Sequence, residues 1–169
     1  MAGKSIGIDA SSVTDMLRED HKKVKGLFEE FEQAEDSKTK QRIVETVLME
    51  LGIHAALEEE LIYPAIRSEI DDEPLMDEAL EEHHVVHGLL AELKKMKPSD
   101  ERYDAKFTVL GECVKHHIEE EESEMLPKAE GADIEWEDLH EKVMKRKEQL
   151  VAKGAAPSKN GKEKAPAKK

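Results

Sequence analysis

The sequence predicts an all-α protein: an antiparallel up-down four-helix bundle with a short fifth helix and a disordered C-terminal tail. Three observations support this prediction. Charged residues make up 39% of the 169 residues and aromatic residues only 4%, a composition rich in helix formers and poor in strand formers. Four long segments repeat apolar residues at helical spacing. The connections between these segments are short, which favours antiparallel neighbours.

We expect one domain with an extension at each end. Residues 1–11 are expected to form a flexible arm, and residues 12–152 the bundle with its C-terminal helix. The tail, residues 153–169, contains six lysines and one glutamate among alanines and prolines. Because the tail has little apolar surface to bury, we expect it to be disordered, with an unknown partner.

The first two helices are expected over residues 13–33 and 38–64. Ser11 or Ser12 is the expected N-cap of the first. One face of this helix carries, at helical spacing, Leu17, His21, Val24, Phe28 and Phe31. The corresponding face of the second carries Val44, Val47, Leu51, His54, Glu58 and Leu61. In both helices, polar side chains therefore interrupt an otherwise apolar face.

Three further helices follow. The third is expected to begin near Pro74, a favourable residue in a first turn. Its apolar face carries Met76, Leu80, His83, His87 and Leu90. The fourth, expected after an N-cap at Ser99, carries Phe107, Leu110, Val114, His117, Glu121 and Met125. A shorter segment, residues 133–150, offers Trp136, Leu139, Val143 and Leu150 for packing.

The charge and the cysteine count exclude several classes of protein. A formal net charge of −14 argues against nucleic-acid or membrane binding by the folded domain. A single cysteine excludes an internal disulfide and fits a reducing cytoplasm. The N-terminus lacks the apolar core of a signal peptide, and no segment approaches the ~20 apolar residues of a membrane span. We therefore expect a cytoplasmic protein.

The bundle consists of two copies of a helix pair, because the chain contains an internal repeat. EDHKKVKGLFEEF (19–31) aligns without gaps with EEHHVVHGLLAEL (81–93). HAALEEELIYP (54–64) likewise aligns with HIEEEESEMLP (117–127). The matched polar residues are His21 with His83, His54 with His117, and Glu58 with Glu121.

The His-x3-Glu spacing in the second helix of each pair indicates a metal site. Residues i and i+4 lie on one helix face, ~5–6 Å apart, so two such pairs and two further histidines can converge in the core. Imidazole nitrogen and carboxylate oxygen suit iron, manganese or zinc, and two metals about 3.5–4 Å apart form a recognised arrangement. An unpaired buried carboxylate is costly, which also favours a cation. The candidate ligands are His21, His54, Glu58, His83, His87, His117 and Glu121.

These motifs resemble the hemerythrin family, whose bacterial form is often called the HHE cation-binding domain. The resemblance covers about residues 15–128. It implies a non-haem centre of two iron ions joined by an oxo or hydroxo bridge. Residue by residue, it implies one iron held by His21 and His54, a second held by His83, His87 and His117, and bridging carboxylates from Glu58 and Glu121.

One departure from the family pattern concerns the last motif. The oxygen-carrying hemerythrins place an aspartate five residues after the last histidine, whereas here a glutamate stands four residues after His117. The bacterial domains commonly have that glutamate. The departure therefore bears on reversible oxygen carriage and not on metal binding.

The resemblance implies a protein that binds or reacts with a small ligand: oxygen, peroxide or nitric oxide. Seven protein ligands leave few open positions on two six-coordinate metals, so an organic substrate is not expected. No nucleophile or proton relay is evident beyond the metal centre, and enzyme status stays open. If the protein is an enzyme, we expect a di-iron catalase-like decomposition of peroxide in oxidative-stress defence.

Three alternatives remain. The first is an iron- or oxygen-responsive sensor without catalysis. The second is a ferritin-like site built on two Glu-x-x-His motifs, Glu81 to His84 and Glu137 to His140, although this pair ignores the repeat. The third is a purely structural bundle, which would be as stable without metal as with it.

Overall fold

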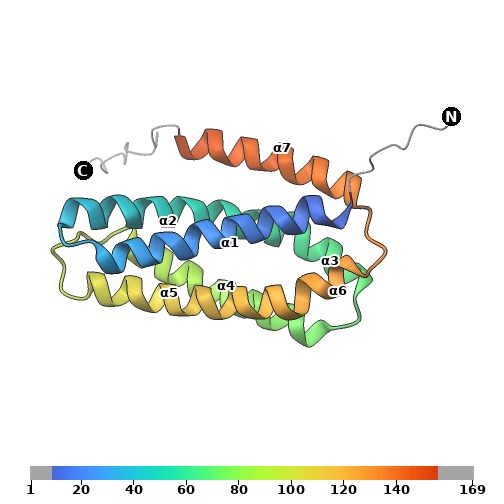
Figure 1. The fold of residues 1–169 in the computed structure, drawn as a ribbon, viewed down its shortest axis with the longest axis horizontal. Helices are drawn as coiled ribbons and strands as arrows, with labels where there is room; N and C mark the ends of the chain where they lie inside the picture. Colours follow the sequence, from blue (N-terminus) through green and yellow to red (C-terminus); the bar gives the residue numbers. More distant parts are fainter. Residues whose placement is uncertain (1–8, 156–169) are drawn as a thin grey trace, which may run out of the picture.

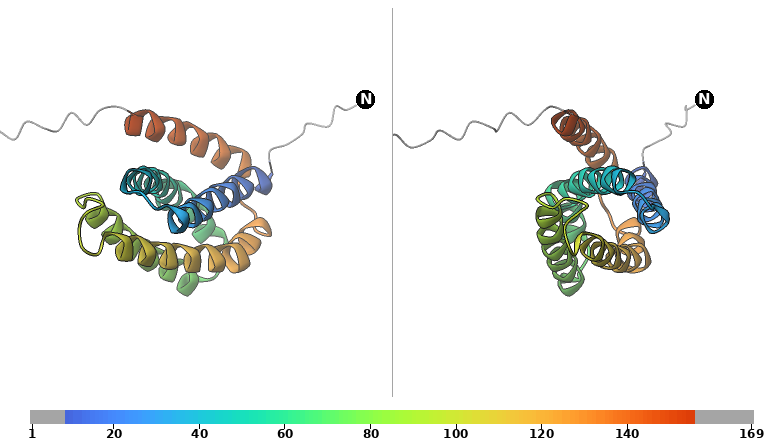
Figure 2. Two further views of the ribbon diagram at one scale, coloured as in Figure 1. Left: turned by 60° about the vertical axis from the view of Figure 1, so that its left-hand side comes forward. Right: turned by 90° about the vertical axis from the view of Figure 1, so that its left-hand side faces the viewer.

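The structure, a computed structural model, describes residues 9–155 as an all-α molecule. Four antiparallel helical rods form a bundle, and a fifth helix lies along one side of it (Figures 1 and 2). The elements are α1 (Ala10–Gln33), α2 (Ser37–Leu57), η1 (Glu58–Ile62), α3 (Tyr63–Glu69), α4 (Glu73–Leu93), α5 (Tyr103–Glu120), η2 (Glu121–Met125), α6 (Leu126–Glu130) and α7 (Trp136–Ala155). The predicted four-helix bundle is confirmed.

The terminal extensions fall almost entirely outside the described part of the chain, which excludes residues 1–8 and 156–169. Two expected boundaries nevertheless differ. Helix α1 already begins at Ala10, inside the expected N-terminal arm, and α7 continues to Ala155, past the expected start of the tail. The fifth helix is therefore longer than the sequence suggested.

Aspartate side chains cap three of the long helices, α1, α2 and α4. The prediction that Ser11 or Ser12 caps the first helix is wrong, because Asp9 is the N-cap and its carboxylate accepts a hydrogen bond from the Ser11 backbone N–H at 3.0 Å. Asp36 caps α2 and Asp72 caps α4 in the same way. A carboxylate at this position satisfies a free backbone N–H and interacts favourably with the helix dipole.

The prediction of a cap at Ser99 is also wrong, because α5 begins only at Tyr103. The Asp100 carboxylate accepts a hydrogen bond from the Lys97 backbone N–H at 2.8 Å and closes a turn before the helix. Arg102 then adopts a left-handed conformation with φ of 118°. This conformation ends the turn and delays the start of the helix.

Two π-helical turns, η1 and η2, interrupt the second and fourth rods at equivalent places. In each turn the backbone N–H five residues after the glutamate bonds to the glutamate carbonyl, Tyr63 to Glu58 and Leu126 to Glu121. The sequence predicted continuous helices and did not predict these turns. A π-turn adds one residue to a helical turn. Tyr63 therefore lies on the same face as Glu58 and points into the core.

A polar layer divides the core into two apolar clusters. The cluster nearer the N-terminus of α1 includes Val13, Leu17, Leu57, Ile66, Met76 and Leu126. The other includes Val24, Phe28, Val47, Leu93, Phe107 and Val114. On α1, for example, His21 stands between Leu17 and Val24. Within the described residues, no helix is long and apolar enough to cross a membrane.

Candidate metal centre

The polar layer gathers six ionisable side chains in the middle of the bundle. All six are buried, and Glu58 and Glu121 have exposed fractions of only 0% and 1%. They come from all four rods: His21 from α1, His54 and Glu58 from the second rod, His83 from α4, and His117 and Glu121 from the fourth. The structure thus brings together six of the seven residues that the sequence singled out.

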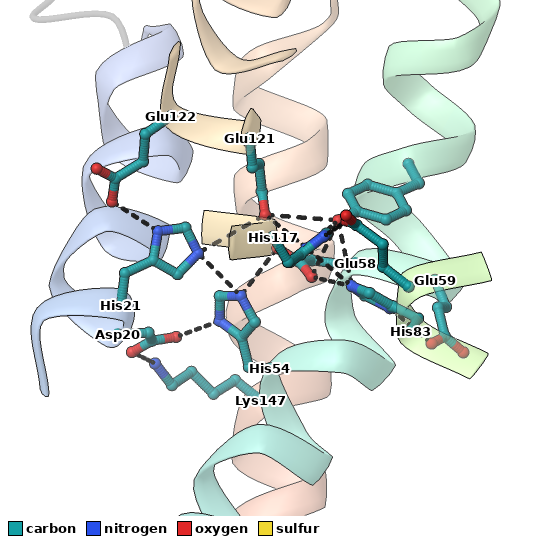
Figure 3. A network of polar contacts seen from close by, with 12 residues as sticks. Asp20, His21, His54, Glu58, Glu59, His83, His117, Glu121, Glu122 and Lys147 are labelled. Carbon is teal, nitrogen blue, oxygen red and sulfur yellow. Dashed lines mark hydrogen bonds and ion pairs between the residues drawn. The ribbon is translucent and has the colours of Figure 1, made fainter. Parts of the chain in front are cut away.

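One half of the centre is built around the imidazoles of α1 and α2 (Figure 3). The Nε2 atoms of His21 and His54 lie 3.2 Å apart. His54 Nε2 lies 2.9 Å from Glu58 Oε1, and His21 Nε2 lies 3.7 Å from Glu121 Oε2. One donor atom from each of these four residues lies within 4.8 Å of the others, a spacing compatible with a single ion.

The other half repeats this arrangement around the imidazoles of α4 and α5. The Nε2 atoms of His83 and His117 lie 3.2 Å apart. His83 Nε2 lies 3.1 Å from Glu58 Oε2, and His117 Nε2 lies 3.2 Å from Glu121 Oε2. Each glutamate therefore faces both halves.

A carboxylate stands behind each of the four imidazoles and holds its Nδ1 atom. These outer carboxylates pair as follows: Glu122 with His21 at 2.8 Å, Asp20 with His54 at 3.3 Å, Glu59 with His83 at 2.8 Å, and Glu82 with His117 at 2.5 Å. A carboxylate at Nδ1 fixes the tautomer, so that Nε2 is free to bind a metal.

None of these four carboxylates, Asp20, Glu59, Glu82 and Glu122, was predicted from the sequence. The repeat held the signal. It aligns Asp20 with Glu82, just before a histidine, and Glu59 with Glu122, just after a buried glutamate. For Glu59 and Glu122 this signal is specific, because, apart from the two buried glutamates, the neighbouring glutamates align with residues that are not acidic. Asp20 and Glu82 share it with two other acidic pairs, Glu19 with Glu81 and Glu30 with Glu92.

The two buried glutamates have opposite electrostatic environments. Burial alone would raise the pKa of Glu58, but His54 and His83 outweigh burial and hold that pKa well below its ordinary value. Burial and the neighbouring Glu58 raise the pKa of Glu121 to about 7. The surroundings of Glu58 therefore favour its charged form, whereas those of Glu121 favour its protonated form more than water does.

Both glutamates also carry an oxygen without a hydrogen bond. Glu58 Oε1 and Glu121 Oε1 are buried and accept none, and the contact between Glu58 Oε1 and His54 Nε2 lies outside hydrogen-bond geometry. A buried oxygen without a partner costs free energy. A cation in each half would supply the missing partner, so the residues present fit a metal centre.

The comparison with known families agrees with this geometry. The family model described as the hemerythrin HHE cation binding domain matches residues 12–129. The chain belongs to this family.

Relatives of this hemerythrin domain occur in bacteria and in yeast. A protein named DNA nickase from Nostoc sp. is 33% identical over 118 residues, which cover 68% of this chain and 32% of that protein. An uncharacterized hemerythrin-like protein from Schizosaccharomyces pombe is 27% identical over 130 residues, which cover 76% of this chain and 64% of that protein. The chain thus spans about a third of the first relative and less than two thirds of the second.

A solved structure shows the same fold. The hemerythrin HHE cation-binding domain-containing protein from Mycobacterium kansasii matches with a TM-score of 0.69 at 29% identity, over 82% of this chain and 86% of that chain. Both the fold and the family of this hemerythrin domain are therefore established.

The structure places the seventh candidate, His87, outside the group of six. Its side chain is 45% exposed, and its Nε2 lies 2.7 Å from Glu59 Oε1. His87 therefore contacts the carboxylate behind His83 and not the buried glutamates. His87 follows His83 by one turn of α4 and lies at the edge of the bundle.

Tyr63 is a residue of the centre that the sequence interpretation missed. Its hydroxyl lies 3.2 Å from His117 Nε2 and 3.3 Å from His83 Nε2, and it donates a hydrogen bond to Glu58 Oε2 at 3.3 Å. Burial, Glu121 and Glu58 raise its pKa well above the ordinary value, so the phenol keeps its proton. The only signal in the sequence was that the repeat aligns a tyrosine with the apolar Leu126.

The ferritin-like alternative is not supported by the structure. His84 is exposed, and His140 lies on α7, outside the bundle core. Neither Glu-x-x-His motif contributes to the polar layer.

Proposed function

We propose that this hemerythrin domain holds two iron ions, one in each half of the centre, with Glu58 and Glu121 bridging them. The observation that carries the proposal is the convergence of four imidazole Nε2 atoms on two buried glutamates, each facing both halves. A mixed nitrogen and oxygen donor set suits iron, manganese or zinc. The resemblance to hemerythrins favours iron among these metals.

We propose further that the centre reacts with a small molecule such as oxygen, nitric oxide or peroxide. A cavity of about 30 Å³ adjoins the four imidazoles, and almost all of its other lining is apolar: Val24, Leu51, Ala55, Val86, Val114 and Ile118, with Asp20 at one edge. A small, largely apolar space beside four imidazoles suits a diatomic molecule or peroxide better than an organic substrate, whose pockets usually have several hundred Å³.

The side chains of the centre have separable roles in this proposal. The imidazoles bind through Nε2 while the outer carboxylates keep their Nδ1 atoms protonated. The Tyr63 hydroxyl holds a proton beside both glutamates. Bound iron would supply electron transfer to the small ligand. If the reaction is catalytic, we propose the disproportionation of two peroxide molecules to two waters and one dioxygen.

DNA cleavage, which the name of the Nostoc relative suggests, is a weaker proposal for this chain. The match covers 32% of that protein. A net charge of −14 disfavours contact with nucleic-acid phosphates.

Metal analysis combined with spectroscopy tests the proposal. The protein is produced in iron-rich medium, its metals are quantified, and near-ultraviolet spectra are recorded with and without oxygen, nitric oxide or peroxide. We expect about two irons per chain and spectra that change with at least one of these ligands. Zinc alone, or well under one metal per chain, would contradict the di-iron proposal. Peroxide consumption without a lasting spectral change would favour an enzyme over a carrier.

A further inference from the structure

Helix α7 lies outside the segment that the hemerythrin family model matches, yet it contacts the metal centre. The family match ends at residue 129 and α7 begins at Trp136. The helix packs on α1 and α2 (Figure 1), and its Leu139 and Val143 are buried. Lys147, one turn after Val143, continues the same face. At the level of the metal centre, the packed face of α7 therefore carries a lysine.

The lysine reaches the centre through one of the outer carboxylates. Lys147 Nζ lies 3.3 Å from Asp20 Oδ1, and Asp20 Oδ2 lies 3.3 Å from His54 Nδ1 (Figure 3). The two oxygens of a single carboxylate thus bind two different groups. Asp20 is only 18% exposed at its side chain and Lys147 29%. The contact is therefore partly shielded from water, where an ion pair is stronger than at an open surface.

Among the described residues, no other outer carboxylate has such a partner. Glu122 contacts His21 alone, whereas Glu59 and Glu82 each contact a second histidine, His87 and His116. Asp20 is the outer carboxylate paired with a lysine. The support for His54 therefore depends on an element outside the bundle.

We infer that Lys147 is a positioning residue of the metal centre: it holds Asp20 in the orientation that fixes the His54 imidazole for metal binding. A lone aspartate of α1 can rotate toward solvent, whereas a carboxylate bound at both oxygens is restrained. Through this contact α7 stabilises the half of the centre formed by His21 and His54. The inference rests on the metal-binding part of the proposed function and requires neither iron nor a particular small ligand.

Arg146, the neighbour of Lys147, provides a matched control. It forms a bidentate ion pair with Glu60 on the surface between α7 and η1. Arg146 Nε lies 2.7 Å from Glu60 Oε2, and Arg146 Nη2 lies 3.0 Å from Glu60 Oε1. The pair helps to attach α7 but touches neither the six buried residues nor the outer carboxylates. Substitution of Arg146 therefore reports what weaker attachment of α7 does by itself.

The test is the rate of metal loss from the loaded full-length protein in excess chelator, measured on iron-loaded and on cobalt-loaded samples. We expect Lys147→Met to lose metal about three- to tenfold faster than the unaltered protein, a smaller effect than the roughly 10–100-fold loss of metal affinity that is typical when a carboxylate behind a ligand is itself removed. Lys147→Arg should restore slow loss, because it restores the charge. Arg146→Ala should lose metal at the unaltered rate.

The emission of Trp136, the single tryptophan, reports whether α7 stays packed in each variant. Unchanged emission in Lys147→Met together with faster metal loss supports the inference. Equal rates for Lys147→Met and the unaltered protein, or faster loss in Lys147→Met and Arg146→Ala alike, would overturn it. A protein that retains cobalt but not iron would refute the di-iron proposal and leave this inference standing. Failure to retain either metal would refute both.

Discussion

At the scale of single residues, the centre depends on the two different nitrogens of imidazole. In each of the four buried histidines, Nδ1 faces an outer carboxylate and Nε2 faces the middle of the centre. A ring held at both nitrogens has little freedom to rotate. The imidazole rings therefore lose their rotational freedom during folding, and metal binding does not have to orient them.

Two neighbouring glutamates allow a sharp test of which carboxylate binds metal. Glu121 is buried, whereas Glu120 is 32% exposed and contacts His116. We expect Glu121→Gln to weaken metal binding by about 3 kcal/mol, more than a hundredfold, because a buried charge pair loses one partner. Glu120→Gln should keep its full metal content, measured by elemental analysis after gel filtration. Equal losses in both variants would show that the register of η2 is wrong.

The pKa values of the metal-free centre predict the pH dependence of metal affinity. Burial and Glu58 raise the pKa of Glu121 to about 7. For His117, burial lowers the pKa, but hydrogen bonds to Glu121 and Glu82 outweigh it and raise the pKa to about 10. Both groups bind protons more tightly than in an unfolded chain, and a metal must displace those protons.

Metal affinity should therefore increase as the pH is raised through 7, by about tenfold per pH unit for each proton that the metal displaces. At a pH below 7 the affinity should be correspondingly lower. Competition titrations with a chelator between pH 5.5 and 8 measure this slope. Proton release into a weakly buffered solution on metal addition gives an independent check. An affinity that stays constant over this range would contradict the prediction.

At the scale of the helices, two π-turns adapt straight rods to a crowded centre. The extra residue in η1 turns Tyr63 toward the helix face of Glu58. The extra residue in η2 turns Leu126 toward the helix face of Glu121. Glu58 and Glu121 are the first residues of these turns, so the extra residue comes after them and each keeps its i+4 relation to a histidine. The π-turns thus change the orientation of Tyr63 and Leu126 and leave the positions of the candidate ligands unchanged.

Two helical glycines predict opposite responses to the same substitution. Nothing lies within 4 Å of the position that a Cβ would take at Gly52, whereas at Gly111 it would meet the Phe28 ring at 3.0 Å. Alanine is about 1 kcal/mol more favourable than glycine inside a helix. We expect Gly52→Ala to raise the free energy of unfolding by about 0.5–1 kcal/mol.

Gly111→Ala should cancel or reverse that gain, because crowding a packed core costs about 1–3 kcal/mol. Chemical denaturation of both variants in the metal-free state measures the difference. Equal stabilities would mean that Phe28 moves aside freely, in conflict with its burial against Phe107.

At the scale of the whole molecule, the centre ties together all four rods. Each half takes its ligands from three rods, and Glu58 and Glu121 each lie close to a histidine of both halves. A bound ion is therefore a cross-link within a chain whose net charge of −14 opposes compaction. Metal loading should affect the stability of the entire bundle and not of one helix.

Metal removal should lower the melting temperature of the full chain. A ligand at a hundred times its dissociation constant stabilises the folded state by about 2.7 kcal/mol, which corresponds to roughly 5–10 °C for a domain of this size. Calorimetry of metal-free and metal-loaded samples measures the shift, and Glu120→Gln should show it in full. A purely structural bundle would melt at the same temperature in both states.

Much of this fold is predictable because its signals are local or repeated. Helical spacing identified the rods, and the internal repeat selected His117 over His116 and Glu121 over its neighbours. What escaped prediction depends on contacts between distant segments. The support of His54 by Asp20 joins two helices, and the support of Asp20 by Lys147 joins segments 127 residues apart.

The π-turns escaped prediction for a related reason. Each turn is followed two residues later by a proline, Pro64 or Pro127, which disfavours a regular helix but does not specify where an extra residue is inserted. Without η1, Tyr63 would not be expected to face the centre. The caps were missed because aspartate and serine both fit an N-cap, and the chain has both near the start of α1.

The repeat aligns Tyr63 with Leu126, so the two otherwise equivalent halves of the centre differ chemically. The phenol stands beside His83 and His117, whereas the residue that the repeat aligns with it, Leu126, is a buried hydrocarbon side chain that cannot donate a hydrogen bond. Two ions held in these two halves would have different electronic surroundings although their protein ligands match. Mössbauer spectra of protein loaded with isotopically enriched iron should therefore contain two components of equal area, and Tyr63→Phe should bring their parameters together.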